Sequence, residues 1–177
     1  ADLLNREQVA ARVGEALQRL GRVDVLCHLA GGFHMGAPVH ATPASAWDFM
    51  LNPNAASLIH VAAAVVPRML AQRSGRIVTV GAGGGLKGGG QMGAYSAAKS
   101  ALMRLSESMS AELRDQGINV NCVLPSTLDT PANRAAMPDA DASRWVAPNA
   151  LAEVIGFLAS DAARAIHGAL IPVYGRV

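Results

Sequence analysis

A tyrosine and a lysine stand four residues apart in the segment AYSAAKSAL, at Tyr95 and Lys99. If the segment is helical, both side chains lie on one face of the helix, one turn apart. The pKa of tyrosine is ordinarily about 10, and a fixed ammonium nearby favours the phenolate, so this pair could exchange protons nearer neutral pH. The spacing indicates general acid catalysis. Without further context, such a pair is usually two solvated side chains on a helix face.

The elements that must position this pair alternate along the chain. Short, continuous apolar runs predict strands at 22–30, 75–82, 118–125 and 169–175. Helical patterns occupy 6–20, 42–70, 92–114 and 149–160, with Thr42 as the expected N-cap of the second and prolines interrupting it at 53 and 67. Buried strands that alternate with helices are typical of a parallel sheet covered on both faces. We therefore predict one α/β domain over residues 1–177.

The beginning of the chain departs from that pattern. A doubly wound sheet normally opens with two βαβ units that carry a glycine-rich phosphate loop, and no strand precedes 6–20. Without those units, the strand at 22–30 becomes a sheet edge that exposes backbone and apolar surface. We expect a longer polypeptide, a partner chain that completes the sheet, or a remnant without activity.

A glycine run at 81–90 imitates a phosphate loop. Gly83, Gly85 and Gly88 have the G-x-G-x-x-G spacing, but the strand expected after the following helix, 118–125, contains no acidic residue to hold a ribose. We therefore interpret the run as a flexible active-site loop.

Composition narrows the function to small-molecule chemistry. The net charge is only +2, and no cluster of basic residues is interleaved with aromatics, so nothing indicates nucleic acid or an anionic membrane as partner. No apolar stretch approaches transmembrane length and no signal peptide is evident, which predicts a cytoplasmic protein. Cys27 and Cys122 lie in apolar runs and are interpreted as buried structural thiols. The five histidines lack metal-ligand spacing, and His34, which follows a strand, is the one expected to face a substrate.

Five segments occur in the order DVLCHLAGG, WDFMLNPNAASLIHVAAAVVPRML, GRIVTVGAGGGL, AYSAAKSAL and INVNCVLPSTLDTP. In order and spacing they resemble the short-chain dehydrogenase/reductases over nearly the whole chain. The resemblance implies a Rossmann-type doubly wound parallel sheet and NADH or NADPH as cofactor. It also implies that Tyr95 donates a proton, and that Lys99 binds the nicotinamide ribose and lowers the pKa of the tyrosine.

The same resemblance assigns further site residues. Asn54, seven residues after Trp47, matches the helix asparagine that anchors a water in the proton relay. Leu29 replaces an asparagine that the family has before its Ala-Gly turn. Contacts with the cofactor are implied for Ala30, Gly31, Pro125, Leu128 and Thr130, in addition to Tyr95 and Lys99.

One position departs from the family in a way that bears on the substrate. Ala82 stands thirteen residues before Tyr95, where the family usually has a serine that binds the substrate carbonyl. Dihydropteridine reductases lack that serine and resemble this chain over 124–145, which implies hydride transfer to a quinonoid dihydropterin. YSAAK and Asn54 look more like the common pattern, which leaves a generic ketone or alcohol oxidoreductase as the alternative.

The surroundings of the site give the remaining expectations. Ala82, His34 and Met92 are candidates for the substrate pocket, and 126–145 is long enough to be a lid. The family forms homodimers or homotetramers through the helices that correspond to 50–70 and 92–114. A non-catalytic scaffold that retains those helices is the alternative to an enzyme. The residues that distinguish NADH from NADPH lie outside this sequence.

Overall fold

The computed structural model describes residues 1–177 and contains one four-stranded sheet. Its strands are β1 (Val25–His28), β2 (Gly75–Val80), β3 (Ile118–Pro125) and β4 (Leu170–Val173). All three pairings are parallel and the spatial order equals the chain order, with Leu26 opposite Ile77 and Thr79 opposite Cys122. The predicted α/β class with a parallel sheet is therefore confirmed, although β1, β2 and β4 are shorter than expected.

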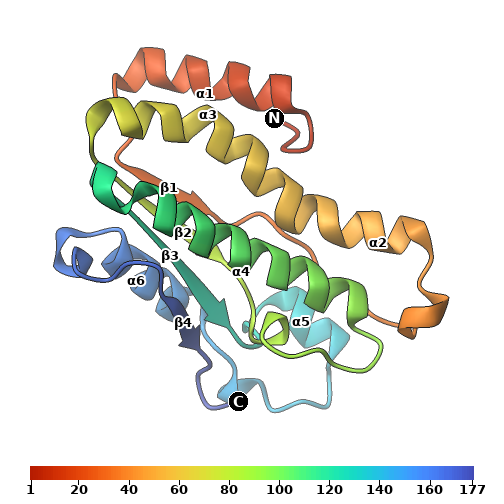
Figure 1. Cartoon of the computed structure of the whole chain (residues 1–177). Coiled ribbons are helices and arrows are strands. Elements are labelled where there is room, and N and C mark those ends of the chain that lie inside the picture. The colour runs from red at the N-terminus through yellow and green to blue at the C-terminus, as the bar shows by residue number, and fades with distance from the viewer.

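Six α-helices connect and cover the strands (Figure 1). They are α1 (Arg6–Leu20), α2 (Ala44–Leu51), α3 (Ser57–Gln72), α4 (Gly93–Leu113), α5 (Pro131–Ala136) and α6 (Pro148–Leu158). Asn5 caps α1 by accepting a hydrogen bond from the N–H of Gln8, and Gly21 ends it at a φ of 75°. Short turns of other helix types fill several of the connections.

One face of the sheet is covered by α1, α3 and α4, which Figure 1 shows side by side. Side chains alternate along each strand, so Ile77 points to this face while Val78 points to the other. The main cluster on this face consists of Val9, Val61, Val65, Met69, Ile77, Leu113, Ile118 and Val120. A second cluster beside it joins Leu58, Leu102, Met103, Cys122 and Leu124.

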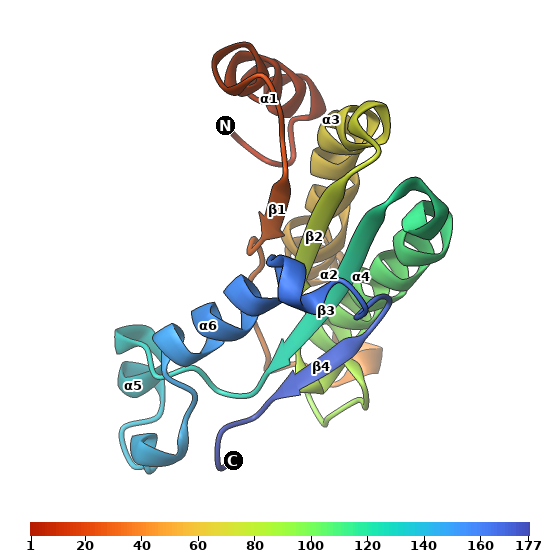
Figure 2. The ribbon, with the colours of Figure 1, turned by 90° about the vertical axis from the view of Figure 1, so that its left-hand side faces the viewer.

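The opposite face is covered by α6, as the turned view in Figure 2 shows. Val78 and Val123 pack there against Leu151 and Leu158 of the helix. The sheet grows in one direction from β1 to β4, yet this last crossover runs on the face opposite to the two before it. The β3–α6–β4 crossover therefore has the opposite hand to its predecessors, a rare arrangement among parallel crossovers.

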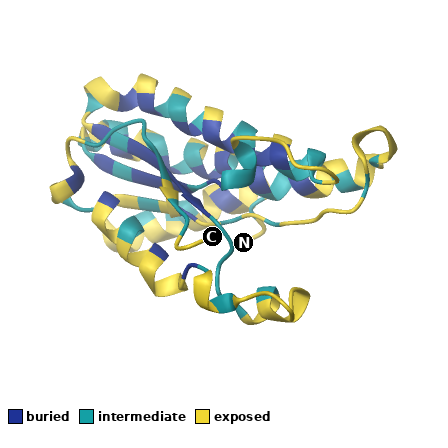
Figure 3. Ribbon diagram, turned by 90° about the horizontal axis from the view of Figure 1, so that it is seen from below, coloured by how far each residue is buried: buried dark blue, intermediate teal, exposed yellow.

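The outer strand β1 lies at the edge of the sheet and exposes apolar side chains, so the expectation of an exposed edge is confirmed. The interpretation of its apolar run as a strand buried on both faces is wrong. Val25 and Cys27 point to the face that α6 covers farther along the sheet, and both are exposed, whereas Cys122 in the middle of β3 is fully buried. The prediction of a buried Cys27 is thus wrong, because burial depends on the neighbours of a strand and not on its own apolar sequence. Figure 3 shows the buried positions gathered on the central strands and on the inner sides of the helices.

The long helix before β2 differs from expectation in two ways. Thr42 does not cap it: its hydroxyl donates to the carbonyl of Pro38, and α2 begins at Ala44 after Pro43. Helical residues then continue through Ala44–Gln72, a stretch of 29 residues that is long and apolar enough to cross a membrane. By length and composition, the expectation that no apolar stretch approaches transmembrane length is therefore wrong. Leu58 and Val65 of this stretch are buried in the two clusters on the sheet, as in a core helix.

Candidate functional site

The carboxyl ends of all four parallel strands meet at one edge of the sheet, where the loops leading to α2, α4 and α5 begin. Ligands of open α/β sheets bind outside this edge. Helix α4 starts at Gly93, so Tyr95 and Lys99 lie in its first two turns, one turn apart as predicted. Both residues therefore belong to the edge at which the strands end.

Lys99 is a buried cation with one hydrogen-bond partner. Lys99 is only 7% exposed, and its Nζ donates to the carbonyl oxygen of Val80 at 2.9 Å. Burial lowers the pKa of Lys99 from 10.5 to about 8. An ammonium has three donor hydrogens, and no other hydrogen bond or ion pair to protein occupies the remaining two.

Tyr95 lies between an aromatic ring and the glycine loop. Its ring centroid is 4.8 Å from that of Phe33, with the two planes at 86°, and a Cβ on Gly84 would lie 3.4 Å from its Cε1. Burial raises the pKa of Tyr95 above 10. The expected net lowering of this pKa is therefore wrong, because desolvation disfavours the phenolate. The role of Lys99 toward Tyr95 stays a prediction.

Asn54 is fixed by a local change of helix type. Pro53 has no N–H to give, and the N–H of Ser57 reaches back five residues to Asn52, which makes residues 52–56 a turn of π-helix. Within that turn the buried Asn54 amide nitrogen donates to Met50 at 2.8 Å and to the carbonyl of Gly32 at 3.0 Å. The N–H of Gly32 donates in return to Asn54 Oδ1 at 3.2 Å. Asn54 thereby ties the helix to the turn after β1, and its role in holding a water stays a prediction.

Gly31 joins these groups in one place. A Cβ at this position would lie 2.7 Å from Asn54 Oδ1 and 3.1 Å from Lys99 Nζ, whereas one on Gly32 meets only the Met50 methyl at 3.9 Å. The backbone at Gly31 thus passes directly beside both polar groups. Gly31, Asn54 and Lys99, which were predicted from separate segments, are brought together; below they are called the Gly31 cluster.

His28 supports this cluster and was not foreseen. It is 3% exposed, and its Nε2 lies 3.1 Å from the Ser57 hydroxyl, which itself donates to the carbonyl of Pro53 at 2.7 Å. Because the only hydrogen of Ser57 is used in that bond, His28 is the donor and carries its proton on Nε2. Burial, and secondly the charge of Lys99, lowers the pKa of His28. A histidine at the end of an apolar strand, followed by a turn, was the available signal.

The glycine run lies beside Tyr95 and packs against α4, and its inability to bind phosphate stays a prediction. A Cβ on Gly85 would be 2.8 Å from Met103 Sδ and 3.1 Å from the backbone of Lys99, so this glycine permits close packing on α4. A Cβ on Gly83 would be 3.2 Å from the hydroxyl of Tyr174, so this glycine permits the close approach of the C-terminal segment. The loop therefore lies next to Tyr95, as predicted, while its flexibility stays a prediction.

The residues after β3 form a compact turn at the same edge. Pro125 ends the strand, and Thr130 caps α5 by accepting a hydrogen bond from the N–H of Asn133 at 3.2 Å. The Asn133 side chain donates to the carbonyl of Leu128 at 2.8 Å. The stretch predicted to be a lid thus contains α5, a 3-10 turn at 142–144 and a half-buried Trp145. Closure of this stretch over the site stays a prediction.

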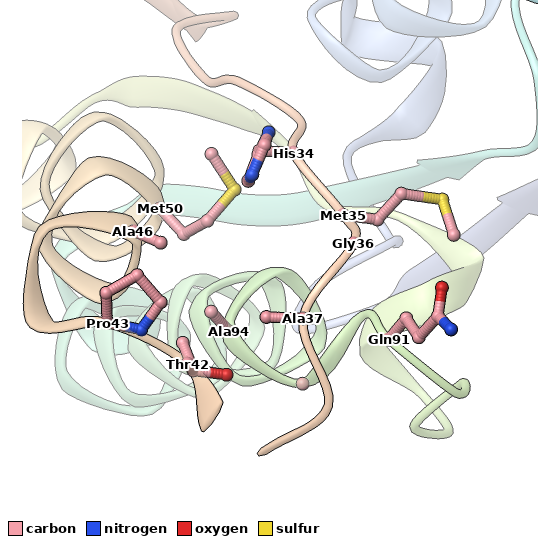
Figure 4. Close-up of a pocket in the computed structure, with 11 residues that line it drawn as sticks. His34, Met35, Gly36, Ala37, Thr42, Pro43, Ala46, Met50, Gln91 and Ala94 are labelled. Carbon is pink, nitrogen blue, oxygen red and sulfur yellow. The ribbon is translucent and has the colours of Figure 1, made fainter. Parts of the chain in front are cut away.

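A cavity of about 270 Å³ opens at the start of α4, where Gly93 and Ala94 line it (Figure 4). Its walls come from the loop after β1, from the start of α2 and from the start of α4. The lining residues are His34, Met35, Gly36, Ala37, Thr42, Pro43, Ala46, Met50, Gln91, Gly93 and Ala94. His34 lines this cavity, and its contact with a substrate stays a prediction. Ala82 and Met92 do not line it: Ala82 is buried at the end of β2, and the Met92 side chain lies near Gly84 and Gly89.

Comparison with known proteins agrees with this geometry. Residues 1–175 match a short-chain dehydrogenase family model described as "Enoyl-(Acyl carrier protein) reductase". Dehydrogenase/reductase SDR family member 6 of Xenopus laevis is 32% identical over 166 residues, which cover 85% of this chain and 67% of that protein. The (-)-trans-carveol dehydrogenase of Rhodococcus erythropolis is 32% identical over 197 residues, with coverage of 98% and 71%.

A solved structure shows the same architecture. The crystal structure of NAD+-bound xylitol dehydrogenase superposes with a TM-score of 0.90 at 26% identity, over 99% of this chain and 76% of that one. The chain belongs to the short-chain dehydrogenase/reductase family. Members of this family are NAD(P)-dependent oxidoreductases with a Rossmann-type fold, so the predicted family and fold are confirmed.

Proposed function

We propose that this chain transfers hydride between a nicotinamide cofactor, NADH or NADPH, and a small carbonyl or quinonoid substrate, with Tyr95 as the proton donor. The observation that carries the proposal is the Gly31 cluster, which places an incompletely bonded, buried ammonium one helical turn from Tyr95. A buried cation with two free donors is costly unless something binds it. The family match supplies the reaction class.

The residues present fit the nicotinamide end of such a cofactor. Lys99 has two donor hydrogens left for the hydroxyls of a ribose, and the missing side chain of Gly31 leaves the approach to Nζ open. We place Ala30 and Thr130 near the same end, on the turns after β1 and β3. The bound cofactor supplies the hydride, and the protein supplies position and a proton.

Proton delivery is the task of the side chains themselves. Tyr95 is neutral at pH 7 because burial raises its pKa, so it holds the proton that a reduced carbonyl oxygen needs. Lys99 is mainly charged at pH 7, because its pKa of about 8 lies above that pH. We assign to Lys99 the stabilisation of the phenolate that remains after the transfer, a role supported by the family match. His28 and Asn54 hold the backbone that faces Lys99 in place.

Two substrate classes are supported, the first by Ala82 and the second by the relatives. The methyl side chain offers no hydroxyl for a carbonyl oxygen, which supports a quinonoid dihydropterin as acceptor, a class that needs no such contact. A simple ketone or secondary alcohol is the second class, supported by relatives named for carveol and xylitol. We further propose that two or four copies associate through α3 and α4, the helices that correspond to 50–70 and 92–114.

Oxidation of NADH and NADPH by the purified protein tests the proposal, with quinonoid dihydropterin and a panel of cyclic and acyclic ketones as acceptors. Tyr95→Phe should reduce kcat/KM by about 100-fold to 10,000-fold, the usual contribution of a general acid. The chain has one other tyrosine, and Tyr174→Phe is the matched control with an expected change below about threefold. Equal activity of the two variants would contradict the assignment. Absence of both turnover and cofactor binding would favour a non-catalytic scaffold.

A further inference from the structure

Exposed apolar side chains gather on the loops around Tyr95. Phe33 is 58% exposed and Met35 is 45% exposed on the loop after β1, and Leu86 is 54% exposed on the loop after β2. Single exposed apolar residues are ordinary on protein surfaces. These three lie on loops that follow two neighbouring strands, at the edge where the reaction is placed, and below they are called the apolar rim.

Phe33 is the member of this rim that touches the reacting group. Its ring meets the Tyr95 ring edge to face at 4.8 Å, yet more than half of its surface stays open to solvent. A carbonyl oxygen that takes the tyrosine proton must lie at the Tyr95 hydroxyl, and the rest of the substrate must then lie beside these two rings. Phe33 therefore offers an apolar surface to the body of the substrate.

The walls of the cavity of about 270 Å³ include residues that are neighbours of Phe33 and Tyr95 along the chain. His34 and Met35 follow Phe33 directly, and Gly93 and Ala94 directly precede Tyr95. The N–H of Gly36 donates to the carbonyl of Gln91 at 3.0 Å, which joins the two walls. An apolar cavity of about 150 Å³ is large enough for a benzene ring. The present volume therefore suits one ring or two fused rings.

The side chains that line the cavity disfavour the binding of a charged ligand. No Lys, Arg, Asp or Glu lines the cavity, and its polar side chains are those of His34, Thr42 and Gln91. A carboxylate or phosphate moved into it would lose its hydration without gaining a charged partner, which is strongly unfavourable. The methionine, alanine and proline side chains contributed by Met35, Met50, Ala46 and Pro43 suit a hydrocarbon instead.

We propose that Phe33 and this cavity bind the carbon ring of an uncharged cyclic ketone and thereby hold its carbonyl at Tyr95. The proposal rests on the proposed function, which places the reacting carbonyl at that tyrosine. Packing on Phe33 takes over the orienting role that a hydroxyl at position 82 would otherwise have. A bulky ring is oriented well by such packing, and a small acyclic ketone is oriented poorly.

Substrate specificity provides the first test. With NADH or NADPH in excess, kcat/KM is measured for 2-decalone, 2-butanone and 4-oxocyclohexanecarboxylate. We expect a preference for 2-decalone over both others, and we expect Phe33→Ala to reduce the ratio of decalone to butanone about tenfold, mainly through KM. Phe157→Ala, at a 47% exposed phenylalanine on α6, is the control that should leave the ratio unchanged. An unchanged ratio in Phe33→Ala overturns the proposal.

Ligand binding without turnover separates this proposal from the proposed function. In an NMR titration with 2-decalone, the amides of 34–37 and 91–94 should shift and saturate, and Ala46→Phe, which fills the cavity, should abolish the shifts. Such binding without reduction of any ketone would overturn the proposed reaction and support the ring site. Ketone reduction without these shifts would support the reaction and overturn the ring site. Absence of both results would overturn both.

Discussion

The inner and outer parts of the site are built differently. The inner part consists of His28, Gly31, Asn54, Ser57 and Lys99. All except Gly31 are buried, and the side chain of each buried residue makes a hydrogen bond within the chain. The outer part consists of Phe33, Met35, Leu86 and the cavity beside them, where apolar side chains are exposed on loops. The inner part holds its polar atoms by hydrogen bonds, and the outer part presents apolar side chains to solvent.

This difference corresponds to two tasks. A proton donor and a cation act efficiently only when their positions are held before the substrate arrives, which requires packed elements and satisfied polar groups. Selection among substrates depends on the shape and polarity of a surface, and loops can supply either without disturbing the sheet. We therefore expect changes in the inner part to alter rate and stability, and changes in the outer part to alter specificity.

The largest effect inside the inner part is expected for Lys99→Met. Loss of the ammonium should reduce kcat/KM by about 100-fold or more, because no cation then assists Tyr95. The same change should stabilise the fold. The pKa of Lys99 is about 8 in the folded chain and 10.5 ordinarily, so the charged form costs roughly 3 kcal/mol at pH 7.

The sign of this stability effect follows from the lowered pKa. The unfolded chain holds the proton more tightly, so the cost is complete below about pH 8 and vanishes as the pH rises past the ordinary value of 10.5. Urea unfolding at pH 7 should therefore give a higher unfolding free energy for Lys99→Met than for the wild type. A lower value at pH 7 would show that the bond to Val80 outweighs the cost of burial.

A smaller effect is expected for His28→Leu, which removes the donor to Ser57 and keeps a similar volume. Loss of a buried hydrogen bond should lower the unfolding free energy at pH 8 by about 1–3 kcal/mol. Ser57→Ala should give a similar loss, and the double variant should lose less than the sum because the two residues share one bond. Additive losses would contradict the bond between them.

The pH dependence of stability gives a second test of the contribution of His28. Its pKa is lowered in the folded chain, so the unfolded chain takes up the proton first, and stability should fall as the pH drops below about 6.5. His28→Leu should flatten the stability curve from that pH downward. The pKa values of Asp129 and Asp141 are lowered from their ordinary value of 3.8. These two groups therefore change the stability only below that pH and do not affect the range around pH 6.5.

Much of the inner part could be predicted from the sequence. Tyr95, Lys99, Asn54 and Gly31 lie in segments whose order and spacing identify the family, and the short apolar runs identify the strands. Family motifs include these residues because regular helices and strands fix their spacing along the chain. The geometry that joins them, such as the close approach of Gly31 to Asn54, is a property of the folded chain.

The remaining features depend on contacts between distant segments. Cys27 is exposed because β1 is an edge strand with a neighbouring strand on one side only. The apolar sequence of a strand does not show how many strands pair with it. The raised pKa of Tyr95 follows from desolvation, whereas the spacing of Tyr95 and Lys99 predicted only the opposing influence of a charge. Phe33 became informative only through its contact with Tyr95, which joins a loop to a helix.

The most direct test of the account is the affinity for NADH and NADPH of two alanine variants at adjacent glycines. In Gly31→Ala the new methyl would meet Asn54 Oδ1 at 2.7 Å and Lys99 Nζ at 3.1 Å, whereas in Gly32→Ala it meets only a flexible methionine at 3.9 Å. We predict that Kd, measured by fluorescence titration, rises about tenfold or more for Gly31→Ala and stays within about twofold of the wild type for Gly32→Ala. Equal Kd values for the two variants would contradict the placement of the cofactor beside Gly31, Asn54 and Lys99.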